Sequence, residues 1–277
     1  MTVTSRTVVG LVLLSASTLI SACAGTQPAP LVNPVVSESS AIRTVDFEAR
    51  IPVQLRLAGA MLDSGKAPAA AKIYQTVLER EPGNVAALMG LGDALLYNGG
   101  YDEAVDAYTK AAQIDAKSAL PRLGLGRAFI QMRQPEAALE RFTEASSLAP
   151  TDSRAKVGRG VALNLLGQHD EAIAEYRTVL TAQPGNRAAA NNLALSLTLT
   201  GQNAEAIRRL ERLAQAADAP PRVRQNLALA LGLAGENERA AVIARMDQSP
   251  EDVTNNQRFM ELIRSLVPAA VKQGNQT

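Results

Sequence analysis

Apolar and small residues recur along residues 51–254 with the spacing of helices that bury one face, in a unit that restarts every 34 residues. The units start at Ile51, Val85, Ala119, Ser153, Arg187 and Pro221. Position 20 of the unit is alanine in all six: Ala70, Ala104, Ala138, Ala172, Ala206 and Ala240. Position 8 is always small: Ala58, Gly92, Gly126, Gly160, Ala194 and Ala228. Position 24 is aromatic in the first four units: Tyr74, Tyr108, Phe142 and Tyr176.

These columns predict two helices in each unit. Small residues at positions 8 and 20 allow the two helices to approach closely, and large residues at positions 11 and 24 fill the space around that contact. Glycine at position 15 predicts the end of the first helix, where a left-handed backbone is needed. It occurs in five units: Gly65, Gly99, Gly167, Gly201 and Gly235. Prolines such as Pro82 end the second helix.

The pattern resembles the tetratricopeptide repeat over residues 51–254. The resemblance implies an all-α fold, a right-handed superhelical solenoid of about six tetratricopeptide repeats. We expect a C-terminal capping helix at residues 255–268, since a final repeat must cover its outer face. Apolar residues fall on one face of this segment: Phe259, Leu262, Ile263 and Leu266. The polar residues 269–277 are expected to form a disordered tail.

The resemblance also implies a concave surface lined by positions 2, 5, 9 and 12 of the first helices. The apolar candidates are Leu55, Leu62, Met89, Leu96, Leu120, Leu123, Ile130, Val157, Val161, Leu195 and Leu229. The polar candidates are Asp93, Arg127, Arg154, Asn164, Asn191, Arg222 and Gln225. An apolar stripe with polar interruptions suits the buried face of a partner's amphipathic helix. The alternative is that the stripe packs against neighbouring repeats. Aspartate at Leu123 and Val161 is expected to abolish partner capture while leaving helicity intact.

Residues 1–22 have the pattern of a secretory signal peptide. Arg6 precedes an apolar run over residues 8–20, which is too short to span a bilayer. The run ends in Ile20-Ser21-Ala22-Cys23, which resembles the lipobox of bacterial lipoproteins. That resemblance implies cleavage before Cys23 and a covalent lipid on its sulfur. The alternative is an ordinary secretory signal followed by an incidental cysteine.

Residues 23–50 are predicted to be the acylated Cys23 and a flexible tether. Pro28, Pro30 and Pro34 oppose helix formation in this stretch. Ala24 follows the cysteine, where many lipoproteins retained in the inner membrane have aspartate. The resemblance therefore implies a lipid anchor on the periplasmic face of the outer membrane.

Composition favours a binding protein that is not an enzyme. Lys and Arg number 28 against 27 Asp and Glu, so no net field favours nucleic acid. With one cysteine and one histidine, no zinc site of thiolates and imidazoles is possible. His169 lies at a turn position and is expected to be a stacking or solvated residue. We expect no catalytic residue, metal, cofactor or small-molecule substrate, apart from the lipid on Cys23.

The later repeats resemble the TadD family of lipoproteins from tight-adherence (Flp) pilus systems. The resemblance rests on Asn191-Asn192-Leu193-Ala194-Leu195-Ser196 and on Val223-Arg224-Gln225-Asn226-Leu227-Ala228-Leu229. It implies a pilotin-like assembly factor whose partner is a segment of the pilus secretin. The alternative is a general periplasmic scaffold that recruits peptidoglycan enzymes or an outer-membrane assembly machine.

Overall fold

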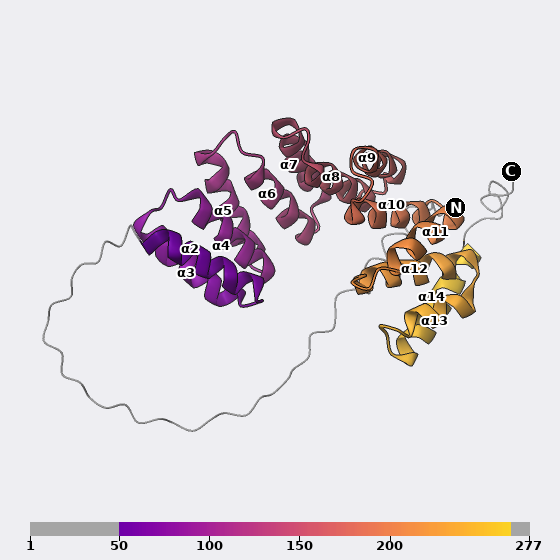
Figure 1. The fold of residues 1–277 in the computed structure, drawn as a ribbon. Coiled ribbons are helices and arrows are strands. Elements are labelled where there is room, and N and C mark those ends of the chain that lie inside the picture. Colours follow the sequence, from indigo (N-terminus) through magenta and orange to yellow (C-terminus); the bar gives the residue numbers. More distant parts are fainter. Residues whose placement is uncertain (1–49, 267–277) are drawn as a thin grey trace, which may run out of the picture.

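The computed structural model describes residues 50–266, which form thirteen helices and contain no β-strand. The first helices of the six repeats, here called A helices, are α2 (Ile51–Asp63), α4 (Val85–Tyr97), α6 (Leu120–Gln131), α8 (Ser153–Leu165), α10 (Arg187–Leu199) and α12 (Pro221–Ala234). The second, or B, helices are α3 (Ala67–Arg80), α5 (Tyr101–Ile114), α7 (Pro135–Leu148), α9 (His169–Ala182), α11 (Asn203–Ala214) and α13 (Asn237–Ala244). The last helix is α14 (Pro250–Leu266). The predicted all-α solenoid is confirmed (Figure 1).

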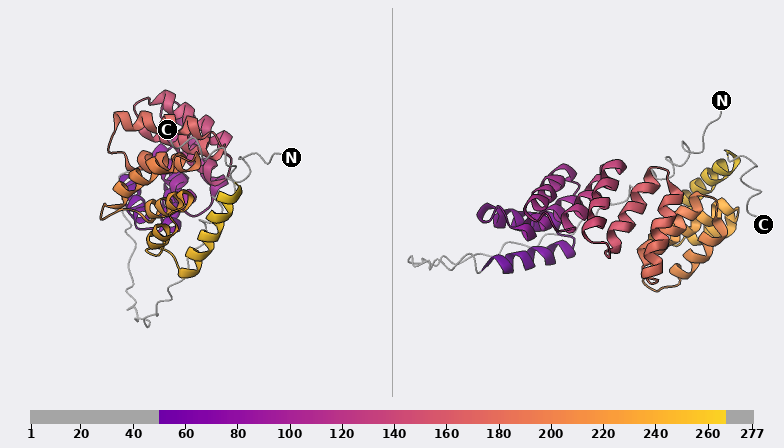
Figure 2. Two further views of the ribbon diagram at one scale, coloured as in Figure 1. Left: turned by 90° about the vertical axis from the view of Figure 1, so that its right-hand side faces the viewer. Right: turned by 90° about the horizontal axis from the view of Figure 1, so that it is seen from above.

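Each helix from α2 to α13 packs mainly against the helices before and after it in the chain, whereas α14 packs mainly against α12. The A helices of successive repeats also contact one another directly, from α2 through α12, whereas successive B helices diverge. Closer approach on the A side bends the stack, so the A helices line its inner side. Figures 1 and 2 show the pairs following one another along an arched, elongated path.

Side-chain caps mark the start of three A helices. Asn84 and Asn186 have extended backbones, and their Oδ1 atoms accept hydrogen bonds from the backbone nitrogens of Ala87 at 2.9 Å and Ala189 at 3.0 Å. Asp152 does the same for the nitrogen of Arg154 at 2.9 Å. These bonds satisfy backbone donors that have no partner inside the helix.

Position 15 ends the A helices with a left-handed residue. The five glycines predicted there have φ between 76° and 89°. The third repeat has Arg133 at this position, and it adopts the same conformation with φ 57°. Arg133 is the single non-glycine residue with positive φ among residues 50–266. A Cβ is disfavoured in this region, so the third repeat carries local backbone strain.

Aromatic rings at position 24 of the first three repeats pack against the repeat that follows. The Tyr108 ring lies so close to Gly92 of its own repeat that a Cβ there would be 2.5 Å from Cε1. The same ring covers Gly124 of the next repeat, where a Cβ would be 2.6 Å from Cδ1. Tyr108 is 0% exposed. The Tyr108 ring is thus packed between two glycines of successive repeats. The Phe142 ring is packed in the same way between Gly126 and Gly158.

The C-terminal helix α14 covers the last A helix. It begins at Pro250, five residues before the start predicted for the capping helix. Val253 and Met260 are buried, and the Met260 sulfur would be 2.0 Å from a Cβ placed on Gly232 of α12. The predicted packing of Leu262, Ile263 and Leu266 concerns side chains outside the described part.

The predicted signal peptide (1–22), acylated Cys23 with nearly all of the tether (23–50), and tail (269–277) also lie outside the described residues. Between residues 50 and 266, no helix combines the length and apolar character needed to cross a bilayer.

Candidate partner-binding surface

The inner side of the arch carries most of the predicted groove residues in accessible positions. Leu120 is 46% exposed, and nine other apolar candidates are half-buried. Six of these nine pack partly against core clusters: Leu55, Leu62, Met89, Leu96, Ile130 and Val157. The other three, Val161, Leu195 and Leu229, belong to none of the core clusters of the described chain.

Two of the predicted groove residues are buried instead. Leu123 is 7% exposed and packs in a core cluster with Ala138 and Phe142, because α6 turns this residue toward α7. Asn191 is 5% exposed, and its Oδ1 accepts a hydrogen bond from Nδ2 of Asn226 at 3.0 Å. Both residues therefore stabilise the stack, and the prediction that they line the partner-binding groove is wrong.

Asp93, Arg127 and Tyr108 form a polar network between the second and third repeats. Asp93 and Arg127 occupy position 9 of successive repeats and form an ion pair. The Tyr108 hydroxyl donates to Oδ1 of Asp93 at 2.7 Å. Burial, then the Asp93 charge, raises the pKa of Tyr108 well above its ordinary value. Tyr108 therefore stays a neutral donor, and its bond positions the Asp93 carboxylate on the inner surface.

Position 9 forms a ladder along the inner surface. The Asp93–Arg127 pair shows that residues at this position in adjacent repeats are neighbours. The ladder continues through Val161 on α8, Leu195 on α10 and Leu229 on α12, all half-buried. The surface thus changes from a charged pair in repeats two and three to aliphatic side chains in repeats four to six.

Asn164 joins the fourth and fifth repeats. Its Nδ2 donates to Oγ of Ser196 at 2.7 Å. Its Oδ1 lies 3.0 Å from Nδ1 of His169, the first residue of α9. Burial lowers the pKa of His169, although Asp170 and Glu171 act in the opposite direction. His169 is half-buried and bonded to a neighbouring helix, and so is more ordered than the expected solvated turn residue.

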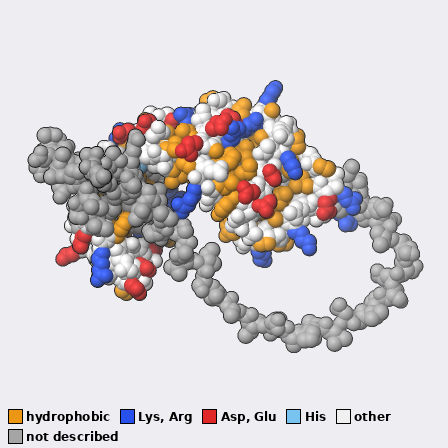
Figure 3. All heavy atoms as spheres, turned by 180° about the vertical axis from the view of Figure 1, so that it is seen from behind, with side chains coloured by type: hydrophobic (Ala, Val, Ile, Leu, Met, Phe, Trp, Pro, Cys, Tyr) orange, Lys and Arg blue, Asp and Glu red, His pale blue; other side chains and the backbone are white. Residues whose placement is uncertain are grey.

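The remaining polar candidates lie on the exposed rim. Arg154 is exposed and held by Asp152, with Nη2 2.6 Å from Oδ2. The hydrogen bond from Arg154 lowers the pKa of Asp152. Arg222 and Gln225 are exposed on α12. Figure 3 shows, from behind, hydrophobic side chains in patches separated by individual acidic and basic groups.

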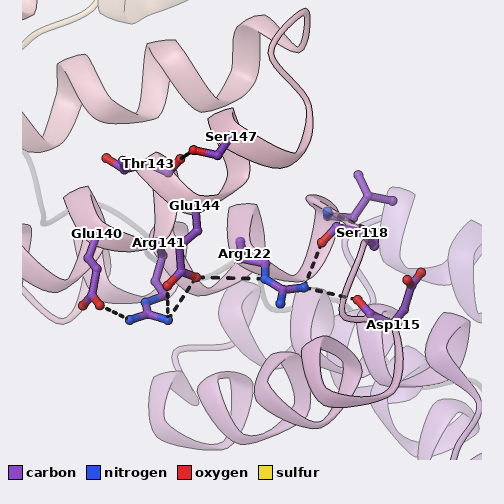
Figure 4. Close-up of polar contacts among 9 residues, drawn as sticks. Asp115, Ser118, Arg122, Glu140, Arg141, Thr143, Glu144 and Ser147 are labelled. Carbon is purple, nitrogen blue, oxygen red and sulfur yellow. Dashed lines mark hydrogen bonds and ion pairs between the residues drawn. The ribbon is translucent and has the colours of Figure 1, made fainter.

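The sequence pattern did not reveal an open cleft on the B side of the stack. It has a volume of about 600 Å³ between α5, α6 and α7. Arg122 at its base donates to the carbonyl oxygens of Asp115 at 3.2 Å and Ser118 at 3.0 Å, and lies 4.0 Å from Glu144 (Figure 4). Glu144 also pairs with Arg141. The charged groups of this cleft are bonded to one another and to backbone carbonyl oxygens. They therefore form a structural network that joins the second and third repeats.

Among the residues that the structure describes, no three His, Cys, Asp or Glu side chains lie close enough to hold a metal ion. Tetratricopeptide repeat models match residues 55–119 and 123–187, and a second such model matches residues 163–230, together more than half of the chain. The chain belongs to the tetratricopeptide repeat family.

Solved structures of other proteins have the same fold, among them two tetratricopeptide repeat proteins. One from Parabacteroides merdae superposes with a TM-score of 0.65 and 16% identity, over 79% of this chain and 87% of that one. The Cut9–Hcn1 hetero-tetramer of the APC/C gives 0.68 and 18%, over 79% and 43%. A thermophilic protein of Thermus thermophilus gives 0.59 and 21%, over 65% and 98%. No curated protein matches in sequence.

Membership in this family indicates a general class of function. Tetratricopeptide repeat proteins generally mediate protein–protein interaction and are typically scaffolds rather than enzymes. The inner surface of the A helices is therefore the candidate contact surface of this tetratricopeptide repeat protein.

Proposed function

We propose that this tetratricopeptide repeat protein is a lipoprotein of the outer membrane that uses the inner surface of its A helices to bind a protein partner. The observation that carries the proposal is the aliphatic part of the position-9 ladder, Val161, Leu195 and Leu229. These side chains are accessible and lie outside the core clusters. Burying such side chains against a partner stabilises a complex by about 25 cal/mol for each Å² of apolar area removed from water.

The inner surface of the A helices suits an amphipathic helix whose apolar residues recur at every turn on one face. Aliphatic side chains at one position of three successive A helices present a continuous apolar strip, and the Asp93–Arg127 pair lies at its N-terminal end. A helix with apolar residues at intervals of three and four could lay its apolar face on this strip. Polar groups beside the strip fix the direction of the bound segment.

The lipid on Cys23 would hold the stack near the membrane. Ile20-Ser21-Ala22-Cys23 supports this part of the proposal, as does the absence of aspartate after the cysteine. About 25 residues of tether allow a root-mean-square reach of roughly 25–30 Å. Tethering raises the effective concentration of the inner surface for a partner at the same membrane without any additional contact.

Within this proposal, the partner is a segment of the secretin of a tight-adherence (Flp) pilus, and the protein acts as a pilotin-like assembly factor. The support is the TadD-like sequence at 191–196 and 223–229. The first of these segments lies on α10 and the second on α12, so both supply residues of the position-9 ladder.

Crosslinking in the native envelope tests the partner, and surface variants test the site. We expect Val161→Asp and Leu195→Asp to lose the crosslinked partner while keeping the helical circular dichroism signal. Val242→Asp is the matched control, since Val242 is 56% exposed on α13 outside the inner surface. Capture of a peptidoglycan enzyme or an assembly machine in place of a secretin would replace the pilotin role with a scaffold role. If both variants still crosslink the partner as the parent protein does, the inner surface is not the binding site.

Anchoring needs a separate measurement. Cys23→Ser is expected to move the protein from the membrane fraction to the periplasmic fraction, because the acylated sulfur is lost. Retention of the variant in the membrane would refute lipid anchoring while leaving the binding surface untouched.

A further inference from the structure

A second row of apolar side chains lies beside the position-9 ladder in repeats four to six. Leucine occupies position 13 of these repeats: Leu165, Leu199 and Leu233. Leu165 is 39% exposed, the other two are half-buried, and none belongs to a core cluster of the described chain. Positions 9 and 13 are four residues apart and therefore share one face of each A helix. We call these leucines, together with the position-9 residues of the same repeats, the double row: Val161, Leu195 and Leu229 complete it.

The double row begins at repeat four. In repeats two and three, position 13 is Tyr97, which is 69% exposed, and Gln131, which is also exposed. Position 9 of the same two repeats is the Asp93–Arg127 ion pair. Both positions are thus aliphatic in α8, α10 and α12 but polar or aromatic in α4 and α6.

The dimensions of the double row fit one helix of a partner. The A helices α8, α10 and α12 are in direct contact, and packed helix axes lie about 8–10 Å apart, so the three helices span roughly 20 Å. Residues seven apart on a helix are separated by about 10.5 Å along its axis, which matches the step from one A helix to the next. About 13 residues of a partner helix are therefore enough to cover the three repeats.

The edge of the inner surface at which each A helix turns into its B helix is acidic. Asp170 and Glu171 lie in the first turn of α9. The adjacent His169 has its Nδ1 3.0 Å from Oδ1 of Asn164, which places the start of α9 beside the C-terminal turn of α8. Glu238 occupies the position of Asp170 in repeat six. All three carboxylates are exposed, and none forms an ion pair with a residue between 50 and 266.

The opposite edge, at which each B helix leads into the next A helix, has no such excess of negative charge. Three carboxylates at that edge are each paired with an arginine: Asp152 with Arg154, Asp218 with Arg187 and Asp247 with Arg224. Arg222 at the start of α12 is exposed and has no ion pair among the described residues. The two edges of the double row therefore differ in charge, because one is acidic and the other is neutral to basic.

We propose that the double row binds an amphipathic helix that carries lysine or arginine on the flank next to Asp170 and Glu171. Turning such a helix end for end on the surface exchanges its two flanks, so one direction alone places the basic flank at the acidic edge. Exposed ion pairs each change an equilibrium constant by about 1.4- to 5-fold. The apolar contact therefore supplies most of the affinity, and the acidic edge sets the direction of the helix. This inference rests on the proposed function, since it specifies the chemistry of the partner at the same surface.

Two designed peptides test the direction with the full chain. Both are amphipathic helices of about 18 residues with the same leucine face, and they differ only in which flank carries three lysines, with glutamine on the other flank. Each has a photoreactive group at its N-terminus, and labelled residues are identified by mass spectrometry. We expect similar affinities but opposite directions, so that one peptide labels repeat four and the other labels repeat six.

Charge removal at the acidic edge tests the cause. Asp170→Asn with Glu171→Gln should weaken binding of both peptides by roughly threefold or more at low salt and should reduce the difference between the two labelling patterns. High salt should remove the difference in affinity from the parent, because it screens exposed charges. Glu79→Gln with Asp106→Asn is the matched control, since these exposed carboxylates lie on α3 and α5, away from the double row. The control should bind and label as the parent does.

The labelling patterns decide the outcome. Labelling of the same repeat by both peptides, or of both repeats equally by each, would overturn the proposal. If neither peptide binds while Val161→Asp still loses the native crosslinked partner, the inner surface remains the binding site and the basic amphipathic helix is the wrong occupant. If Val161→Asp and Leu195→Asp both keep that partner, the proposed binding surface fails and this inference fails with it.

Discussion

A methyl group at Gly124 tests whether the aromatic rings lock successive repeats together. In Gly124→Ala, the new Cβ would lie 2.6 Å from Cδ1 and Cε1 of Tyr108. Carbon atoms in contact are about 3.5–4.0 Å apart, so the ring and the helix must separate by roughly 1 Å. The ring has no room to withdraw, because Gly92 lies against its other side and its hydroxyl is bonded to Asp93 at 2.7 Å.

The expected loss of stability follows from two opposing terms. Overpacking a filled core costs about 1–3 kcal/mol. Alanine in place of glycine inside a helix returns about 0.5–1 kcal/mol. The net loss in the free energy of unfolding should be up to about 2.5 kcal/mol, which lowers the melting temperature by up to about 10 °C for a chain of this size.

Gly59→Ala is the matched control for this variant. Gly59 also lies inside an A helix, but a Cβ there would be 3.8 Å from the Tyr74 hydroxyl, an ordinary contact. We expect it to raise stability by about 0.5–1 kcal/mol through helix propensity alone. The assay is urea unfolding followed by circular dichroism at 222 nm for both variants and the parent chain.

Replacing Tyr108 removes the aromatic ring and tests whether its contact with the new Cβ causes the loss of stability. Leucine is accommodated at position 24 of the fifth repeat as Leu210, so Tyr108→Leu is a conservative background. In that background, Gly124→Ala should lose most of its cost. The reasoning is refuted if Gly124→Ala and Gly59→Ala change stability equally, since the ring would then exert no constraint.

Three further predictions concern single positions. Arg133→Gly should raise the free energy of unfolding by about 1 kcal/mol, because it removes the Cβ from a left-handed residue; unchanged stability in urea unfolding would contradict the assigned strain. Burial lowers the pKa of His169 in the fold, so stability should fall as the pH drops below the ordinary value of 6.5 and level off below the folded pKa. The melting temperature of His169→Gln should lack this decline, and an identical decline in both proteins would exclude His169. Leu123→Asp should unfold part of the stack by burying a charge, whereas Val161→Asp should not, as thermal melts of the two variants will show.

The repeat architecture was predictable from the sequence because its signals are local and repeated six times. Alanine at position 20 and glycine at position 15 each act within one helix pair, and the structure places them as expected. Arg133 was not recognised, because a single arginine in a glycine column carries no sequence sign of its backbone conformation. The start of α14 at Pro250 was missed for a related reason: a proline suits the first turn of a helix as well as its end.

The inner surface was less predictable than the fold. Positions 5 and 9 share a helix face in the pattern, yet Leu123 at position 5 is buried while Val161 at position 9 is accessible. The difference depends on how far each helix rotates toward its neighbour, which no single repeat encodes. The cleft was invisible for the same reason, because Thr109 and Gln113 of the second repeat line it together with Arg122, Arg141 and Glu144 of the third.

Polar groups that already have bonding partners within the stack indicate which part of the inner surface binds the partner. At the N-terminal end of the position-9 ladder, Asp93 is occupied by Arg127 and Tyr108, so a partner would have to displace charge-assisted bonds to use it. Such displacement recovers little free energy, because the new bonds replace existing ones. Val161, Leu195 and Leu229 have no comparable internal partner cluster, and covering them removes apolar area from water without breaking any bond. The net binding free energy should therefore come mainly from repeats four to six, with the charged pair selecting the direction in which the partner lies.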